Sequence, residues 1–271
     1  MVDRPALVES LRRLALTLGA MPLDWQGPLA YERVDSAWII KPRHGRSLSA
    51  RFLVDATGRA SVVARRLGAR RLAADHQAAV VASLDGDDPG GSPMLVEAVS
   101  GGWWYSAQCP RVGLVLAFFT DRDLIDICAA RERDGFHALI ESSRVTRDRA
   151  RANGRPLTGR PCAVAAESSA LDRVCDEGWI AAGDAALAYD PLSGHGLTFA
   201  LASGRDAGRA VRACLRGNPV ALARYADHIA GSAQAYRLGR AVQYAAEGRW
   251  TDNLFWKRRR GSTLADATAT T

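Results

Sequence analysis

A carboxylate and three glycines stand where an apolar run ends, and their spacing could hold a flat anionic ligand. The run 179–182 is typical of a buried strand, and Gly183 and Asp184 follow it directly. Asp190-Pro191 then interrupts the regular secondary structure, because the residue before a proline is disfavoured in the helical region. The segment 193–196 is Ser-Gly-His-Gly, and it starts a predicted long helix. Free N–H groups and the helix dipole favour negative charge at such a start.

A flavin has the shape and charge that this turn could hold. Asp184 could accept hydrogen bonds from ribityl hydroxyls, and the helix start could stabilise charge on the N1–C2=O side of a reduced ring. A buried strand–turn–helix connection with turn glycines is the structural alternative. The whole run 178–204 resembles the second cofactor motif of FAD-dependent monooxygenases and tryptophan-halogenase-like oxidoreductases. The resemblance implies FAD as cofactor, with contacts at Gly183, Asp184, Pro191, Ser193, Gly194, His195, Gly196 and Leu197.

A second motif of the same family follows the predicted strand 48–54. It has the sequence Asp55-Ala56-Thr57-Gly58. In the resembled enzymes a strand ending this way passes close to the cofactor, which makes Asp55 and Gly58 further cofactor-binding candidates. The structural alternative is a strand-to-helix turn capped by Thr57 or Ser61. The two motifs occur in the order that the family has.

Hydrophobic periodicity and turn residues predict the elements around these motifs. Helices are expected at 4–18, 121–130, 131–140, 145–151, 196–215 and 220–247. Strands are expected at 29–34, 37–41, 48–54, 76–84, 94–100, 102–108, 113–120, 162–166, 170–174 and 179–182. The fold class is α/β: an incomplete FAD-binding Rossmann-like domain, an inserted antiparallel β-sheet substrate domain, and C-terminal helices. The expected domains are 1–71 and 169–250 for FAD, 72–168 for the substrate, and a tail at 251–271.

Three aromatic residues, Trp103, Trp104 and Tyr105, form the centre of the inserted sheet. Alternation along a strand puts Trp103 and Tyr105 on one face and Trp104 on the other. One face could line a substrate pocket, which makes all three pocket candidates, although core packing alone would also explain them. In the tail, the rings of 250–256 are expected to pack on the domain and the arginines of 258–260 to face solvent.

Composition narrows the class of protein. The chain has 271 residues, a net charge of +7 and only two lysines, Lys41 and Lys257. The basic residues are spread out and accompany no nucleic-acid-binding module, so a solvated basic surface is predicted and no nucleic-acid partner. No apolar run reaches the ~18 residues of a membrane span. Five scattered cysteines without a C-x-x-C predict neither disulfides nor a metal site, and indicate a cytoplasmic protein.

The family's opening Gly-x-Gly-x-x-Gly unit, which binds the diphosphate, does not occur in this sequence. About the first hundred residues of the family pattern are therefore missing, and an N-terminally truncated protein is predicted. A misplaced start, a split or decayed gene, and a separate N-terminal fragment are the alternatives. We expect the chain as written to bind FAD weakly or not at all.

The family resemblance also implies a reaction. The strand at 102–110 and the tail look closest to flavoproteins that mature quinone-cofactor amine and amino-acid oxidases by hydroxylating a protein tryptophan. This implies a monooxygenase acting on an aromatic small molecule or a protein, with a reductase or NAD(P)H as electron donor. Trp103-Trp104-Tyr105 departs from the halogenase pattern Trp-x-Trp-x-Ile-Pro, which disfavours halogenation. No catalytic residue is assigned. The alternative is a non-catalytic remnant or assembly subunit that does not bind FAD by itself.

Overall fold

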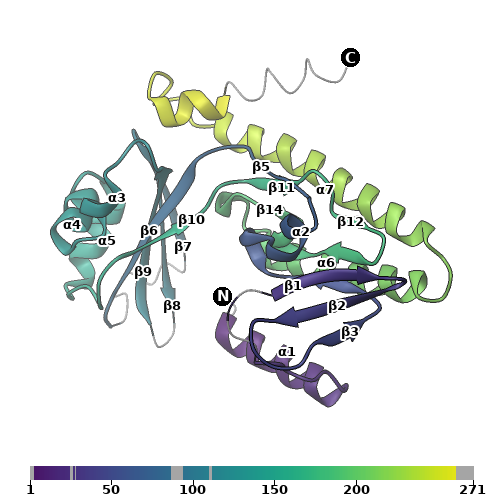
Figure 1. Ribbon diagram of the computed structural model, residues 1–271. Helices are drawn as coiled ribbons and strands as arrows, with labels where there is room; N and C mark the ends of the chain where they lie inside the picture. Colours follow the sequence, from purple (N-terminus) through teal and green to yellow (C-terminus); the bar gives the residue numbers. More distant parts are fainter. Residues whose placement is uncertain (1–2, 25–26, 28, 87–93, 110–111, 261–271) are drawn as a thin grey trace. The chain divides into compact units, whose positions relative to one another are not determined.

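The computed structural model describes residues 3–24, 27, 29–86, 94–109 and 112–260, and the chain divides into two compact units (Figure 1). We call the first the sheet unit. It consists of Met1–Arg12, Asp75–Glu167 and Leu238–Thr271. We call the second the turn unit, which consists of Arg13–Ala74 and Ser168–Arg237. Two helices, α1 (Arg4–Thr17) and α7 (Val220–Ala245), contribute residues to both.

The sheet unit is built on a five-stranded antiparallel sheet in the order β10-β6-β9-β8-β7. Its strands are β6 (Gln77–Leu84), β7 (Met94–Val99), β8 (Gly102–Cys109), β9 (Gly113–Asp121) and β10 (Cys162–Ala165). The register places Trp104 opposite Phe118 and Trp103 opposite Phe119, so aromatic side chains pair across the two central strands. Such cross-strand pairs stabilise an antiparallel sheet. The sheet expected between 76 and 120 is therefore present, with strand ends shifted by a residue.

Three short helices cover one face of this sheet: α3 (Ile127–Ala130), α4 (Arg133–Glu141) and α5 (Val145–Asn153) (Figure 1). Phe136 of α4 is fully buried against the ring of Trp104, with centroids 5.6 Å apart in an edge-on arrangement. Glu97 of β7 accepts hydrogen bonds from the first amides of α5. Burial raises the pKa of Glu97, but hydrogen bonds from Thr146 and its neighbours outweigh it and hold the pKa below its usual value.

The tail packs on the sheet unit. Phe255 and Trp256 are buried, as expected for the aromatic residues. The arginines do not follow the expectation of solvent exposure, because Arg259 is only 3% exposed and donates to both carboxylate oxygens of Asp121. Arg258 also donates to Asp121. The expected tail ended at residue 271, and its part 261–271 lies outside the described residues.

The turn unit contains three small sheets. Their strand orders are β1-β2-β3, β14-β11-β5 and β12-β13-β4. The strands are β1 (Leu29–Val34), β2 (Ala37–Pro42), β3 (Leu48–Ala50), β4 (Leu53–Asp55), β5 (Arg71–Ala73), β11 (Ser169–Leu171), β12 (Cys175–Asp176), β13 (Trp179–Ala181) and β14 (Leu187–Ala188). The helices are η1 (Gly58–Ala60), α2 (Val62–Arg66), η2 (Gly183–Ala185), η3 (Pro191–Ser193) and α6 (Gly196–Cys214).

The centre of the turn unit is the parallel pair β4–β13, the one parallel pairing among the described residues. Leu53, Val54 and Asp55 lie opposite Trp179, Ile180 and Ala181. The β13 residues are all buried, and α6 packs its buried face, including Phe199, into the same apolar core. The carboxyl ends of both strands therefore reach the same edge, which is where the two sequence motifs begin.

Two expected elements are corrected by the structure. The strand expected at 48–54 is two strands, because β3 pairs with β2 whereas β4 pairs with β13, and the chain bends at residues 51–52 between the two sheets. The helix expected at 121–130 begins only at Ile127, where the Asp126 side chain accepts from the amides of Cys128 and Ala129. Residue 121 instead ends β9.

The unit boundaries near 74 and 168 lie close to the expected domain limits of 71 and 168. The last turns of α7 and the tail group with the inserted sheet, however, and not with the surrounding elements. Among the described helices, none combines the length and apolar character that crossing a membrane requires.

Candidate functional site

The first part of the site is the turn after β13. Gly183 adopts a left-handed conformation with φ +60°, and its N–H donates to Ser203 Oγ of α6 at 2.9 Å. A Cβ at this position would come within 3.5 Å of Ala200, so the turn lies directly against the helix. Asp184 follows, and its side chain is about one-third exposed, at 36%. The buried strand thus delivers one carboxylate to an accessible position.

The second part is the approach to α6. The buried Asp190 side chain accepts a hydrogen bond from Leu192 N at 2.9 Å, and Ser193 Oγ donates to Asp190 O at 2.8 Å. These bonds close η3, in which Pro191 occupies the first turn. Gly194 then turns the chain with φ +66° in the left-handed region. Proline and glycine are used here for their backbone geometry.

The start of α6 is open. The positions that a Cβ would occupy at Gly194 and Gly196 have no other atom within 4 Å. Within the described ranges, the N–H groups of Gly196, Leu197 and Thr198 have no hydrogen-bond acceptor. A helix of 19 residues therefore presents free amides and the positive end of its dipole to an uncovered surface. The expectation that this turn lets a flat group approach the backbone fits that geometry.

His195 contributes its backbone to this turn. Its side chain is exposed, and its N–H donates to Ser193 Oγ at 3.3 Å. Pro191 is exposed, and Leu197 and Ser193 are half-buried. The eight residues predicted from the 178–204 motif thus lie in the segment from η2 through η3 to the first two residues of α6.

Arg59 links the two motifs, and sequence reasoning did not single it out. Its Nε lies 3.7 Å from the Asp184 carboxylate, and its Nη2 donates to the carbonyl of Tyr189 at 2.9 Å. Arg59 follows Gly58, whose φ is +66° and whose Cβ position has no other atom within 4 Å. The Asp-Ala-Thr-Gly turn and the Gly-Asp turn are thereby held together by a side chain that belongs to neither motif's predicted contact set.

Asp55 has an internal role. Its carboxylate is fully buried; Oδ1 accepts from the amide and hydroxyl of Thr57 at 2.9 and 2.6 Å, and Oδ2 accepts from Ala64 N at 2.8 Å. Thr57 Oγ1 in turn accepts from Val62 N at 2.7 Å. Thr57 thus satisfies the first amide of α2, although neither Thr57 as N-cap of η1 nor Ser61 as N-cap of α2 makes the side-chain cap hydrogen bond that the sequence left as an alternative. Asp55 therefore shapes the turn through its side chain, and a contact of this segment with a cofactor remains a prediction for its backbone and for Gly58.

Hydrogen bonds made by the side chains of Ser61 and Arg71 fix the backbone of the same turns. Ser61 is fully buried in a left-handed conformation, φ 44°, and its Oγ donates to Ala185 O at 2.9 Å. The Arg71 guanidinium donates to Ser61 Oγ at 2.6 Å, to Ser169 Oγ at 2.7 Å and to Asp184 O at 3.0 Å. A left-handed serine is strained, and burial plus these bonds hold it there. Arg71 is therefore a positioning residue for the backbone of residues 184 and 185.

Aromatic side chains support the turn on its inner side. The ring of Tyr189 lies edge-on to Phe199 with centroids 4.8 Å apart and is tilted against Tyr236 at 4.4 Å. Burial raises the pKa of Tyr189, so its phenol stays protonated. Tyr225 donates to the carbonyl of Ala181 at 2.7 Å, which satisfies the last residue of β13. The segment before α6 is therefore packed against aromatic rings, whereas the Cβ positions of Gly194 and Gly196 have no other atom within 4 Å.

The three predicted pocket residues belong to the other unit. Trp103 is 2% exposed, stacks on Phe119 with centroids 3.9 Å apart, and donates to Tyr244 Oη at 3.2 Å. Trp104 is fully buried among Phe118 and Phe136. Tyr105 is half-buried, and burial raises the pKa of its phenol. Core packing thus accounts for Trp104, and a substrate-pocket role for these residues remains a prediction.

No family model matches the sequence. LodB of Marinomonas mediterranea, which is named as a candidate FAD-dependent oxidoreductase, is 28% identical over 264 residues. That alignment covers 95% of this chain and 70% of LodB. The match confirms the resemblance to FAD-dependent oxidoreductases that the two motifs indicated.

Two solved structures share the fold. CmlS, a flavin-dependent halogenase, aligns with TM-score 0.76 and 20% identity over 99% of this chain and 52% of CmlS. QhpG, a peptidyl tryptophan dihydroxylase essential for tryptophylquinone cofactor biogenesis, aligns with TM-score 0.76 and 23% identity over 96% of this chain and 59% of QhpG. The chain thus spans between half and 60% of the length of these two proteins. At these identities the likeness shows the fold, and it confirms the expected α/β class with several sheets and C-terminal helices.

Proposed function

We propose that this chain carries the flavin-ring site of an FAD-dependent oxidoreductase. The observation that supports this most is the open start of α6, where the amides of Gly196, Leu197 and Thr198 have no acceptor in the described ranges. A flat group that carries negative charge would satisfy them. Free amides of this kind at the positive end of a helix are a general anion site.

The residues present fit such a group. Gly194 and Gly196 leave the space above the turn empty, so a planar ring could lie on the backbone. The Asp184 carboxylate would accept hydrogen bonds from ribityl hydroxyls, and Arg59 would hold that carboxylate in place. FAD, when bound, supplies the redox chemistry, and the protein supplies orientation and electrostatics. In this proposal the amides hold negative charge on the ring, which favours its reduced form.

We further propose a monooxygenase reaction on an aromatic substrate, with a tryptophan of a protein as the substrate class. QhpG, which shares the fold over 96% of this chain, acts on peptidyl tryptophan. Trp103-Trp104-Tyr105 departs from the halogenase pattern, which favours hydroxylation over halogenation although halogenases such as CmlS share the fold. A flavin reductase or NAD(P)H is the proposed electron donor, and no side chain is assigned as acid or base.

The site is tested by following the amides themselves. In a 15N-labelled chain titrated with riboflavin, which has the ring and ribityl chain but no phosphate, the resonances of Gly196, Leu197 and Thr198 should move in a saturable manner. This readout works at the weak affinity expected for the chain alone. Gly196→Val should weaken riboflavin binding at least about tenfold, because its side chain would fill the empty space.

Gly204→Val is the matched control for that experiment. Gly204 is exposed on the same helix, and its Cβ position also has no atom within 4 Å. It should bind riboflavin as the unmodified chain does. If the three amides do not move in the folded chain when riboflavin is added up to its solubility limit, the flavin site is refuted. The alternative of a subunit that does not bind the cofactor then takes its place.

A further inference from the structure

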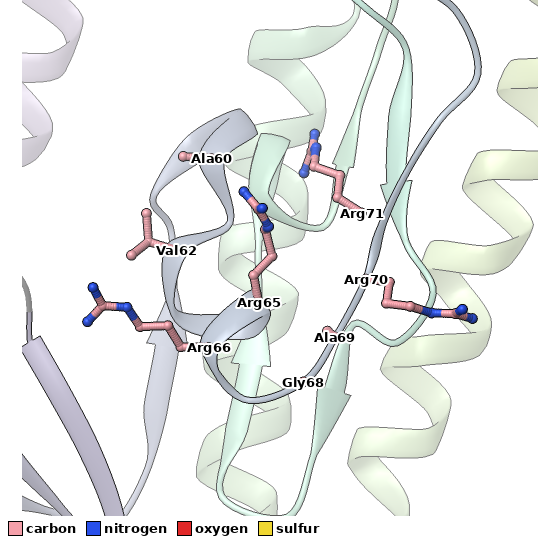
Figure 2. A pocket seen from close by; sticks show the side chains of 8 residues that line it. All are labelled: Ala60, Val62, Arg65, Arg66, Gly68, Ala69, Arg70 and Arg71. Atoms are coloured by element: carbon pink, nitrogen blue, oxygen red, sulfur yellow. The ribbon is translucent and has the colours of Figure 1, made fainter.

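The turn unit has a cavity between α6 and α7, which we call the α6–α7 pocket, and none of the predicted flavin contacts lines it. Its volume is about 360 Å³, which lies within the range of ligand pockets. A larger cavity of about 700 Å³ lies beside α2 (Figure 2) and is lined by Ala60, Val62, Arg65, Arg66, Gly68, Ala69, Arg70 and Arg71. In that cavity the Arg71 guanidinium is already bonded to Ser61, Ser169 and two backbone carbonyls, so its donors serve the fold.

The α6–α7 pocket is formed by corresponding faces of the two helices. Within the turn unit, α6 contributes Asp206, Arg209, Ala210 and Ala213, and α7 contributes Ala221, Arg224, Tyr225 and His228. Both sets follow the spacing i, i+3, i+4, i+7, which places their members on one face of each helix. Asn218, from the segment between the helices, also lines the pocket. Three of these positions are alanines, so the side chains are too short to fill the space between the helices.

The buried part of the α6–α7 pocket is apolar. Ala210 and Tyr225 are 6% and 4% exposed, whereas Ala213 and Ala221 are half-buried. The Tyr225 hydroxyl donates to the carbonyl of Ala181 at 2.7 Å, so its polar end is satisfied and its ring is held in place. A fixed aromatic ring and several methyl groups favour contact with a flat apolar group over contact with water.

The exposed part of the α6–α7 pocket carries a surplus of positive charge. Asp206 is the acidic residue of the lining, and Arg205, outside the lining, donates to its two oxygens at 2.9 and 3.3 Å. Arg209 lies further from that carboxylate, at 3.5 Å. Arg224 is exposed, and its guanidinium has neither a hydrogen bond nor an ion pair in the part of the chain that the structure describes. The charge of Asp206 is thus balanced from outside the pocket, whereas that of Arg224 is not balanced.

We propose that the α6–α7 pocket binds a small organic carboxylate with a flat apolar body. Arg224 and Arg209 would hold the carboxylate, because the planar donors of a guanidinium match both carboxylate oxygens. The apolar body would lie on the ring of Tyr225 and on the alanines. An inorganic anion would leave that apolar surface uncovered. The site does not depend on the flavin-ring proposal, since the two share no residue.

The experiment is a calorimetric titration of the whole folded chain with 2-naphthoate, which carries a carboxylate on a flat apolar ring system. One saturable site is expected. Arg224→Ala should raise the Kd at least about tenfold, because it removes a charge-assisted contact, and Arg224→Lys should recover part of the affinity because it keeps the charge. Arg212→Ala is the control: it removes an exposed arginine of α6 outside the lining, and its Kd should stay within about twofold.

The charged and apolar parts of the ligand are tested separately. 2-Naphthamide has the ring system without the charge, and acetate has the charge without the ring system. Each should bind at least about tenfold more weakly than 2-naphthoate. Ala213→Leu should raise the Kd for 2-naphthoate by a similar factor, because the longer side chain fills the space between the helices. Circular dichroism shows whether each variant is folded.

Four results would overturn the proposal. The first is the absence of a saturable site when 2-naphthoate is added up to its solubility limit. The second is equal weakening by Arg224→Ala and Arg212→Ala, which would mean that net charge alone attracts the anion. The third is binding of 2-naphthamide or acetate as tight as that of 2-naphthoate. The fourth is unchanged affinity in the folded Ala213→Leu variant, which would place the ligand elsewhere. Gly196→Val, which targets the flavin turn, should leave the 2-naphthoate affinity unchanged, so failure of one site is distinguishable from failure of the other.

Discussion

An arginine of the sheet unit and an arginine of the turn unit differ in burial and in pairing. In the sheet unit, Arg259 is 3% exposed, and both oxygens of the buried Asp121 carboxylate accept from it. In the turn unit, Arg65 lines an open pocket, and its guanidinium has no hydrogen-bond or ion-pair partner among the described residues. The first guanidinium is paired with a carboxylate inside the protein, and the second is exposed without a partner in the described residues. Arginine content alone could not separate these roles.

The contrast teaches how to distinguish a structural cation from a binding one. Burying an ion pair costs desolvation that the pairing must repay, so removing one partner leaves an expensive unpaired charge. Removing an exposed, unpaired cation costs the fold little and takes affinity from a ligand instead. Stability and binding measurements should therefore respond to different arginines, and the predictions below test that separation.

The largest effect is expected from Asp121→Asn. It leaves Arg259 buried without its counter-charge, and the free energy of unfolding should fall by about 3–5 kcal/mol. Urea denaturation followed by tryptophan fluorescence measures this loss, since Trp103 and Trp104 lie in the same unit. Asp123→Asn is the control, because its pairing with Arg258 is solvent-exposed and should be worth less than about 1 kcal/mol. Equal losses would contradict the structural role of the buried pair.

Lowering the pH should reproduce part of the loss in the free energy of unfolding that is expected for Asp121→Asn. Burial raises the pKa of Asp121, but hydrogen bonds and the charges of Arg259 and Arg258 outweigh it, so the pKa lies below its usual 3.8. A lowered pKa in the folded state means that the stabilisation is present above about pH 3.8 and is lost as the pH falls through the folded value. Urea midpoints between pH 7 and pH 2.5 should therefore converge for the unmodified chain and Asp121→Asn. A constant difference between them would contradict this linkage.

An intermediate effect is expected from Arg71→Met. The change removes the hydrogen bonds to Ser61, Ser169 and the carbonyl of Asp184, and the free energy of unfolding should fall by about 1–3 kcal/mol. Its neighbour supplies the control: Arg70→Met removes an exposed pair with Asp172 and should cost less than about 1 kcal/mol. If the two variants are equally stable, Arg71 does not position the turn.

The smallest effect on stability is expected from Arg65→Ala. An exposed side chain with no partner in the described residues should change the free energy of unfolding by less than about 0.5 kcal/mol. The same urea experiment measures it, with Arg216→Ala alongside. A loss above about 1 kcal/mol would place Arg65 with Arg259 as a structural residue, and the comparison between the units would fail.

Local pattern predicted most of the fold, and it failed where a strand changes partner. Alternating apolar residues located β1, β2 and the strands of the five-stranded sheet to within a residue or two. The same alternation continues through residues 48–54, so it could not show that β3 and β4 join different sheets. Likewise, a helix is expected from residue 121, yet Asp121 ends β9 and its carboxylate pairs with arginines that lie far along the chain.

The parts of the candidate site that lie within one continuous motif were predictable from the sequence, and the contacts between residues far apart in the chain were not. The turn glycines, Asp184 and the start of α6 follow from one continuous motif, and the structure places them together. The contact of Arg59 with Asp184 joins residues 125 positions apart, and the hydrogen bonds of Arg71 reach Ser169 and Asp184, which are 98 and 113 positions further along the chain. The arginine pairs of the pocket are visible in the sequence, where they suggested a solvated surface. Only the fold shows that they surround a cavity.

The division of the chain into units has a consequence for its synthesis. The turn unit begins near residue 13, is interrupted by the sheet unit, and resumes at Ser168. Its central strand β4 has to wait for β13, since Leu53 pairs with Trp179. A chain that leaves the ribosome N-terminus first cannot complete this unit until residues beyond 180 have emerged, and such long-range pairing is slow. The nascent β4, with Val54 half exposed even in the finished fold, therefore stays without its partner strand until β13 has been synthesised.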